Sequence, residues 1–177
     1  ADSRELPSRI WLFQGLPKAD KMELIIQKAV ELGVYEVVPV VTKRAVVKLD
    51  EKKAAKKVAR WNAIAEGAAK QSGRNRIPEV HDVMTFAEAL EFAKSLDVRL
   101  IPYEKAEGMG TMKSAVDQIK PGESIGVFIG PEGGFSDGEV EIAMNSGVRP
   151  VTLGKRILRT ETAGMFVMAA VGLLLES

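Results

Sequence analysis

Two segments near the C-terminal end of the chain combine glycines with charged and hydroxyl side chains. The first reads GPEGGFS over residues 130–136, and the second reads LGKRILRTETAG over residues 153–164. Each follows an expected strand and leads into an expected helix. In an open α/β sheet, ligands bind at the carboxyl ends of strands, where glycines let the backbone come close to a bound molecule. The two segments are therefore the candidate ligand site.

The first segment lacks the pattern of a phosphate-binding loop. It has neither the Lys-Ser/Thr pair of a P-loop nor the glycine spacing of the dinucleotide fingerprint. Glu132 would also bring negative charge close to a phosphate. The loop therefore favours a neutral or cationic ligand, although alone it could equally be a glycine-rich strand-to-helix turn.

The second segment offers an apolar slot that suits a flat heterocycle, followed by polar groups at the start of the last helix. The slot residues are Leu153, Gly154, Ile157 and Leu158, and the polar residues are Arg159, Glu161 and Thr162. Alternatively, Arg156 and Arg159 only pair with Glu161 or with solvent, and Thr160 or Thr162 only caps the helix. That alternative explains each residue separately but not their clustering.

The composition excludes several classes of site. Hydrophobic residues make up 46% of the 177-residue chain and charged residues 28%, which is ordinary for one soluble globular domain. Without cysteine there are no disulfides and no cysteine nucleophiles, which is compatible with a reducing cytoplasm. His81 is the only histidine, so we expect no metal site, and a Ser-His-Asp triad is improbable. The longest apolar stretch, Met165 to Leu175, is too short to span a bilayer.

Strand and helix patterns alternate along the chain, which predicts an α/β fold with a mostly parallel sheet flanked by helices. Strands are expected at Arg9 to Gln14, Val34 to Thr42, Val98 to Tyr103, Ser124 to Gly130 and Pro150 to Leu153. Helices are expected from Asp20 to Gly33, Asp50 to Ser72, Thr85 to Ser95, Thr111 to Ile119, Ser136 to Gly147 and Thr162 to Glu176.

The last expected helix, Thr162 to Glu176, is apolar almost all round. Its side chains cannot all face one sheet. Either other helices of the same chain enclose it, or it packs against a second subunit.

The two C-terminal motifs closely resemble those of the RsmE family of ribosomal RNA methyltransferases. The resemblance rests on GPEGGFS followed by Glu139, and on LGKRILRTETA. It extends upstream to KMELIIQKAVELG over residues 21–33, to residues 39–47 with Arg44, and to residues 61–78 with QSGR at 71–74.

The resemblance implies a SPOUT fold with a C-terminal trefoil knot, a homodimer and S-adenosylmethionine as methyl donor. One side of the donor pocket is expected from Gly130, Glu132, Gly133 and Gly134. The other is expected from Leu153, Gly154, Ile157, Leu158, Arg159, Thr162 and Ala163, with Pro102 and the loop after it as a third wall.

The implied reaction is methylation of N3 of a uridine in small-subunit ribosomal RNA. It requires loss of the N3 proton and stabilisation of negative charge on the neighbouring carbonyl oxygens. We expect Arg159 to stabilise that charge. Glu161 could act as the base or orient the arginine, although a helix N-terminus lowers the pKa of a carboxylate and weakens it as a base.

The RNA itself is expected to contact Arg44, Gln71, Arg74 and Arg76, which lie in the family-like motifs. Four lysines on the outer side of the long helix are a second candidate RNA surface, but we favour a solvated helix face for them. These lysines are Lys52, Lys53, Lys56 and Lys57.

Residues 1–177 are expected to form a single methyltransferase domain. Family members carry an N-terminal PUA-like β-barrel, and the sequence before Arg9 is too short to form one. Two alternatives remain open: methylation of another RNA position, such as a tRNA ribose or base, and a non-catalytic RNA-binding module.

Overall fold

Seven strands form one sheet in the computed structural model, which describes residues 3–45, 49–106 and 110–177. The sheet order is β3-β2-β1-β6-β5-β7, and β4 pairs with the end of β2. Every pairing between these strands is parallel, which confirms the predicted sheet type. The strands are β1 (Arg9–Gly15), β2 (Glu36–Val41), β3 (Glu79–Val80), β4 (Met84–Thr85), β5 (Val98–Pro102), β6 (Ser124–Ile129) and β7 (Arg149–Val151).

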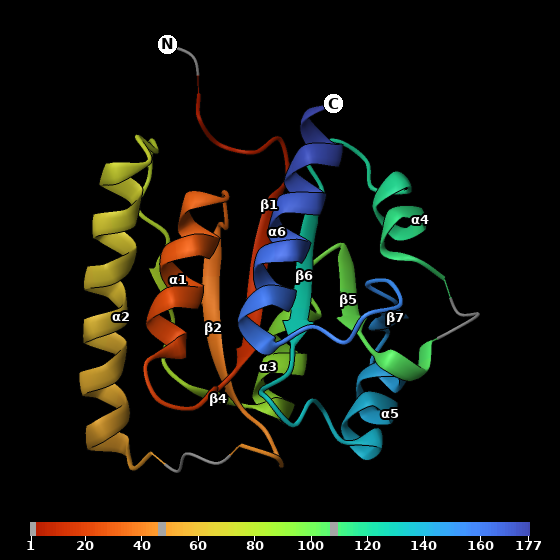
Figure 1. The fold of residues 1–177 in the computed structure, drawn as a ribbon, viewed down its shortest axis with the longest axis horizontal. Helices are drawn as coiled ribbons and strands as arrows, with labels where there is room; N and C mark the ends of the chain where they lie inside the picture. Colours follow the sequence, from red (N-terminus) through yellow and green to blue (C-terminus); the bar gives the residue numbers. More distant parts are fainter. Residues whose placement is uncertain (1–2, 46–48, 107–109) are drawn as a thin grey trace.

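Helices cover both faces of this sheet (Figure 1). Helices α1, α2 and α6 lie in front of the sheet in this view, and α3 and α5 lie behind it. The helices are α1 (Lys21–Glu31), α2 (Glu51–Gln71), α3 (Phe86–Ala93), α4 (Met112–Asp117), α5 (Asp137–Asn145) and α6 (Thr160–Glu176), with a 3₁₀ turn η1 (Glu104–Ala106).

Two hydrophobic cores follow from this layering, because successive side chains of a strand point to opposite faces. On β1, Ile10 and Leu12 belong to the core beneath α1, α2 and α6, whereas Phe13 belongs to the core beneath α3 and α5. Phe13 stacks on Phe128 of β6 with ring centroids 4.4 Å apart. The central strands are therefore buried on both sides, which explains their nearly continuous apolar sequences.

Most predicted helix boundaries are confirmed by capping geometry. Asp50 accepts a hydrogen bond from the Lys53 N–H, and both capping boxes, Thr85 with Glu88 and Ser136 with Glu139, are formed. Asp20 differs, because its side chain makes no capping hydrogen bond.

The sequence expectation also differs from the structure at the start of one helix and at two short strands. Helix α6 begins at Thr160 rather than Thr162, because Thr160 already has helical geometry and uses its hydroxyl elsewhere. The short strands β3 and β4 have too few residues to give an alternating pattern, and so were not predicted.

No helix in the described parts of the chain is long and apolar enough to cross a membrane. The expected trefoil knot stays a prediction.

A parallel sheet has two distinct ends, and both matter below. The carboxyl edge comprises the loops that follow the strands, at residues 16–20, 42–45, 103–106, 130–136 and 152–159. The amino edge comprises the segments that precede them, at residues 3–8, 32–35, 72–78, 94–97, 118–123 and 146–148. In Figure 1 the carboxyl edge lies at the bottom, where the strand arrows point.

Candidate functional site

A pocket of about 300 Å³ opens at the carboxyl edge. Its walls come from the loops after β2, β5, β6 and β7 and from the first turn of α6. The lining residues are Arg44, Pro102, Tyr103, Glu104, Lys105, Ile129, Gly130, Pro131, Glu132, Gly133, Gly134, Phe135, Asp137, Thr152, Leu153, Gly154, Arg156, Ile157, Leu158, Thr160 and Ala163.

The first wall is a tight turn that only glycine can form at two positions. Gly134 has φ +71°, and its N–H donates to the Pro131 carbonyl at 2.8 Å. A Cβ on Gly130 would lie 3.0 Å from the Gly134 backbone, so the chain must be bare there. Arg44 braces the turn from outside by donating to the Gly133 carbonyl at 2.8 Å.

The second wall is an open loop with little side chain of its own. Gly154 has φ +112°, and no atom lies within 4 Å of the place its Cβ would take. The Ile157 side chain is 81% exposed, although it is apolar. Backbone and an uncovered aliphatic side chain thus face the pocket together, as the sequence predicts for a slot that takes a flat apolar group.

The third wall carries a small charged cluster. Tyr103 donates its hydroxyl to the Asp137 carboxylate, and the Lys105 ammonium lies 3.0 Å from the same group. The Tyr103 hydrogen bond, together with Lys105, holds the pKa of Asp137 below its usual range, and the same bond raises the pKa of Tyr103. Asp137 therefore stays ionised at neutral pH and links the loop after β5 to the start of α5.

A buried polar relay joins the first two walls. Gln14, at the end of β1, is 0% exposed, and its side-chain amide donates to the Thr160 hydroxyl at 2.9 Å. The Thr160 hydroxyl in turn donates to the Gly130 carbonyl at 2.6 Å, and Thr160 is only 5% exposed. The relay fixes the start of α6 against the end of β6, so it sets the separation of the two glycine-bearing segments.

An ion network closes the other side of the first wall. The Glu132 carboxylate accepts from the Lys18 N–H at 2.7 Å and lies 3.4 Å from the Lys21 ammonium. Burial is the largest influence on the pKa of Glu132 and raises it, but these contacts and a bond from its own N–H together lower it below the usual value. Lys21 also lies 3.8 Å from Glu161. Lys21 thus ties the first turn of α6 to the GPEGG turn.

Most of the residues expected to bind the donor line this pocket, but Arg159 and Thr162 do not. Glu161, expected as a base or as a positioning residue, is also absent from the lining. Arg159 and Thr162 are exposed, and Glu161 turns its carboxylate towards Lys21. Within the described chain, no hydrogen bond or ion pair joins Glu161 to Arg159, so the expected orienting contact is not formed.

Two of the arginines expected to contact RNA are engaged by other residues at the amino edge, Arg74 buried and Arg76 half-buried. The Arg74 side chain is 3% exposed, pairs with Glu5, and donates to the Val30 and Val34 carbonyls. Arg76 lies 3.7 Å over the Tyr35 ring and donates to the carbonyl of the same residue. The prediction that Arg74 binds phosphate is wrong, because its donors are used and covered.

Arg44 and Gln71 complete this group. Arg44 lies at the pocket, at the carboxyl edge. Gln71 is exposed at the last turn of α2, at the amino edge, which is the edge of the sheet opposite the pocket. The structure therefore separates the residues that the sequence groups together as one RNA contact.

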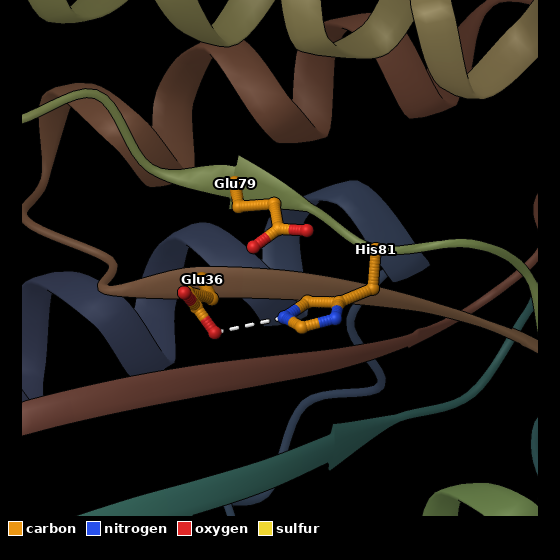
Figure 2. A group of neighbouring side chains, drawn as sticks. All are labelled: Glu36, Glu79 and His81. Atoms are coloured by element: carbon orange, nitrogen blue, oxygen red, sulfur yellow. Dashed lines mark hydrogen bonds and ion pairs between the residues drawn. The ribbon is translucent and has the colours of Figure 1, made fainter.

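A second cluster of ligand-type side chains lies between β2 and β3 (Figure 2). One atom each of Glu36, Glu79 and His81 lie within 4.8 Å of one another. Glu36 is already engaged, because it accepts from the Trp11 indole N–H at 3.0 Å and lies 2.8 Å from His81 Nε2. Its other oxygen is 3.6 Å from Arg76. A cation would have to compete with that guanidinium, so these contacts describe a polar network and support no metal site.

Sequence reasoning missed Gln14 and Lys21 as parts of the site, and it expected the loop after Pro102 as a wall without singling out Tyr103. Gln14 left a usable signal, because an amide ending the apolar run RIWLF, just where the strand reaches the carboxyl edge, has to find a partner. Lys21 and Tyr103 gave no such signal in the sequence, since a lysine in the first turn of a helix and a tyrosine after a strand are common in any fold.

The chain matches known proteins over nearly its full length. The model of the RNA methyltransferase domain family matches residues 4–172. The ribosomal RNA small subunit methyltransferase E of Bacillus subtilis is 42% identical over 173 residues, which cover 96% of this chain and 68% of that protein.

Two solved structures share both fold and sequence. A putative methyltransferase of Legionella pneumophila, in complex with the bound cofactor SAM, is 37% identical with a TM-score of 0.87 over 96% of this chain and 67% of that one. A ribosomal RNA small subunit methyltransferase E of Neisseria gonorrhoeae bound to S-adenosyl methionine is 38% identical, with a TM-score of 0.85 over 97% of this chain and 68% of that one.

A family match over residues 4–172 and a 42% identical relative agree with the parallel sheet and with the two glycine-bearing segments on one pocket. The chain therefore belongs to the RNA methyltransferase domain family and, within it, to the ribosomal RNA small subunit methyltransferase E family.

Proposed function

We propose that this chain binds S-adenosylmethionine in the carboxyl-edge pocket and transfers its methyl group to N3 of a uridine in small-subunit ribosomal RNA. One observation carries the proposal. The segments GPEGGFS and LGKRILRTETAG, which are separate in sequence, form two walls of the same pocket. The two SAM-bound relatives and the family membership support it.

The pocket fits this cofactor in size and in chemistry. A volume of about 300 Å³ is at the lower end of the range for small-molecule sites. The bare backbone at Gly134 and Gly154 can approach an adenine ring, and the ionised Glu132 favours a cationic sulfonium over a phosphate. When bound, S-adenosylmethionine supplies an electrophilic methyl group.

Arg159 is the residue we propose to stabilise the reacting base. It lies at the N-cap of α6, exposed, and its guanidinium makes no hydrogen bond or ion pair to any residue that the structure describes. A free guanidinium can stabilise, by donating hydrogen bonds, the negative charge that spreads onto a uracil carbonyl when N3 loses its proton. Glu161 is better suited to positioning, because one of its oxygens is buried and the other faces Lys21.

Calorimetry with S-adenosylmethionine tests the cofactor. We expect saturable binding to the chain, and no binding would leave only the RNA-binding module. Mass spectrometry of small-subunit RNA after incubation with chain and cofactor tests the target. A methylated uridine at N3 is expected, whereas a methyl group on a ribose or another base would overturn the target assignment.

Arg159→Ala tests the catalytic role, with Lys155→Ala as a matched control from the same loop. Both side chains are exposed cations outside the pocket lining, and only Arg159 stands at the N-cap of α6. With saturating cofactor, we expect single-turnover methylation to fall about 100-fold for Arg159→Ala, the size of effect that loss of one charge-stabilising donor gives. Equal rates for both variants would remove Arg159 from the chemistry.

We also propose that the chain works as a homodimer through α6. The buried side of α6 carries Val167, Met168 and Val171, but Phe166 is 42% exposed and Leu173 is 72% exposed. These two side chains lie two turns apart, on the outer side of the helix. Light scattering should give a dimer for the wild type and a monomer for Leu173→Glu, and a wild-type monomer would contradict the proposal.

Residues 1–177 are proposed to act as one methyltransferase domain, because one sheet connects all strands that the structure describes. We also propose that the activity is cytoplasmic, which a ribosomal RNA substrate supports.

A further inference from the structure

The first two turns of α2 carry four lysines whose charges are not balanced within the described structure. All four side chains are exposed, and none forms an ion pair or hydrogen bond with a residue of the described ranges. They are Lys52, Lys53, Lys56 and Lys57. The run ends at Arg60, whose guanidinium does pair with Glu23 at 3.1 Å.

Helix stability does not explain this arrangement. Cations near a helix N-terminus oppose the macrodipole, which favours acidic residues there. Lys52 with Lys56, and Lys53 with Lys57, are also like charges at i,i+4, which repel each other. Asp50 and Glu51 offset part of this cost at the cap but pair with none of the four ammonium groups. The lysines therefore cost helix stability and need a reason outside the helix.

Their position supplies that reason, because α2 starts at the carboxyl edge. In Figure 1 the first turn of α2 lies at the bottom, level with the loops after β1 and β2 and with the edge that holds the pocket. Those loops add Lys18 and Lys43, whose side chains are exposed and have no carboxylate partner among the residues described. Exposed cations thus extend from α2 along the edge towards the pocket.

We propose that Lys52, Lys53, Lys56 and Lys57, continued by Lys18 and Lys43, form the surface that binds the phosphate backbone of the RNA substrate. This assignment rests on the proposed function, since it concerns RNA delivered to the same pocket. It departs from the expectation from the sequence, which favoured Arg44 and Arg74 over the lysine face; of these two, only Arg44 lies at the carboxyl edge. A polyanion neutralises the mutual repulsion of the lysines on binding, and release of its counterions drives association.

The test compares two variants with the same change in net charge. In the first, Lys52, Lys53, Lys56 and Lys57 are all changed to glutamine. In the control, four lysines at or next to the amino edge are changed to glutamine: Lys28, Lys70, Lys94 and Lys120. Equilibrium binding of in-vitro-transcribed small-subunit ribosomal RNA to the 177-residue chain is measured over a salt series, with circular dichroism and S-adenosylmethionine affinity as checks of the fold.

For the α2 variant we expect the slope of log K against log salt to become shallower by about 3, since each lost phosphate contact removes about 0.7–0.9. We expect the Kd to rise at least about tenfold at low salt, with cofactor affinity unchanged. The control should keep the wild-type slope. Equal losses in both variants would mean a general effect of net charge, and no loss in the α2 variant would mean that RNA binds elsewhere; either result overturns the proposal.

Failure of the proposed function gives a different pattern. In that case the wild-type chain would transfer no methyl group to the RNA, whatever the salt slopes show. The same salt series with heparin in place of RNA identifies a preference for any polyanion, and equal affinity for heparin and RNA would overturn the assignment to an RNA substrate.

Discussion

The two edges of the sheet differ in how some of their positively charged side chains are used. At the amino edge, Arg74 is enclosed by a carboxylate and two carbonyls, and Arg76 is held by Glu36, a carbonyl and an aromatic ring. At the carboxyl edge, Lys21 and Lys105 are paired, but Arg159 and the four lysines at the start of α2 are exposed without carboxylate partners among the described residues. The amino edge therefore uses these two arginines to hold the fold, whereas the carboxyl edge keeps part of its cations free for a ligand.

The same contrast holds for backbone. At the carboxyl edge, Gly134 and Gly154 have positive φ and open space where a side chain would project. At the amino edge, Gly33 and Gly147 also have positive φ, but a Cβ there would lie 2.8 Å from Leu6 and 2.7 Å from Arg99. Gly33 and Gly147 thus serve close packing at the amino edge, whereas Gly134 and Gly154 leave a pocket wall bare at the carboxyl edge.

Arg74→Leu should give the largest effect on stability. The substitution leaves Glu5 without its partner and frees two buried carbonyls, so we expect a loss of about 3–5 kcal/mol in the free energy of unfolding. Arg156→Leu at the carboxyl edge is the matched control and should change it by less than about 0.5 kcal/mol. Urea titrations measure both, and similar losses would remove the distinction between the edges.

Thr160→Val should affect both stability and cofactor affinity. It removes the link between Gln14 and the Gly130 carbonyl and leaves buried polar groups unpaired, which costs about 1–3 kcal/mol. Because the link sets the distance between two pocket walls, we also expect the Kd for S-adenosylmethionine to rise about tenfold or more. Thr162→Val, on the exposed side of the same turn, should change neither; calorimetry that finds the two variants alike would rule out the relay.

Glu5 should make the amino edge sensitive to acid. The hydrogen bond from Arg74 holds the pKa of Glu5 below the ordinary glutamate value of about 4.5 in the folded chain. Its stabilisation is therefore complete above about pH 4.5 and is lost as the pH falls through the lower, folded-state pKa. Glu5→Gln should be less stable than wild type at pH 7, with a difference that shrinks towards pH 3. A difference that stays constant with pH would contradict this ionic role.

Ala19→Gly should give the smallest effect, and an opposite sign. Ala19 has φ +50°, a strained conformation for a residue with a Cβ, in the loop that carries Lys18 to Glu132. We expect the substitution to raise the free energy of unfolding by up to about 1 kcal/mol. Ala63→Gly, at an exposed site inside α2, should lower it by about 0.5–1 kcal/mol. Thermal unfolding that shows both variants destabilised would mean that the loop bears no strain.

Much of the fold follows from local pattern. The apolar runs of β1 and β6, the capping residues Asp50 and Ser136, and the helix-ending Gly33 all specify their elements without reference to distant residues. The two-residue strands β3 and β4 could not be predicted, because they exist only through their pairing with β2.

The parts of the site that require glycine could be predicted from the sequence. The roles of charged side chains were much less predictable, because they depend on partners that are distant in the sequence. Gly130, Gly134 and Gly154 mark backbone that no other residue allows, and all three line the pocket. The role of Arg74 depends on Glu5, which lies 69 positions away, so the sequence shows an arginine but not its burial. The four lysines at the start of α2 show the converse, since their lack of partners among the described residues is visible only when the surrounding surface is known.

Hydrogen–deuterium exchange with and without saturating S-adenosylmethionine tests the account most directly, because it reports both edges in one measurement. The account predicts slower exchange at residues 130–135 and 153–158, the two walls of the carboxyl-edge pocket, and no change at residues 72–78 of the amino edge. Protection at residues 72–78 without protection of the two glycine-bearing segments would contradict it.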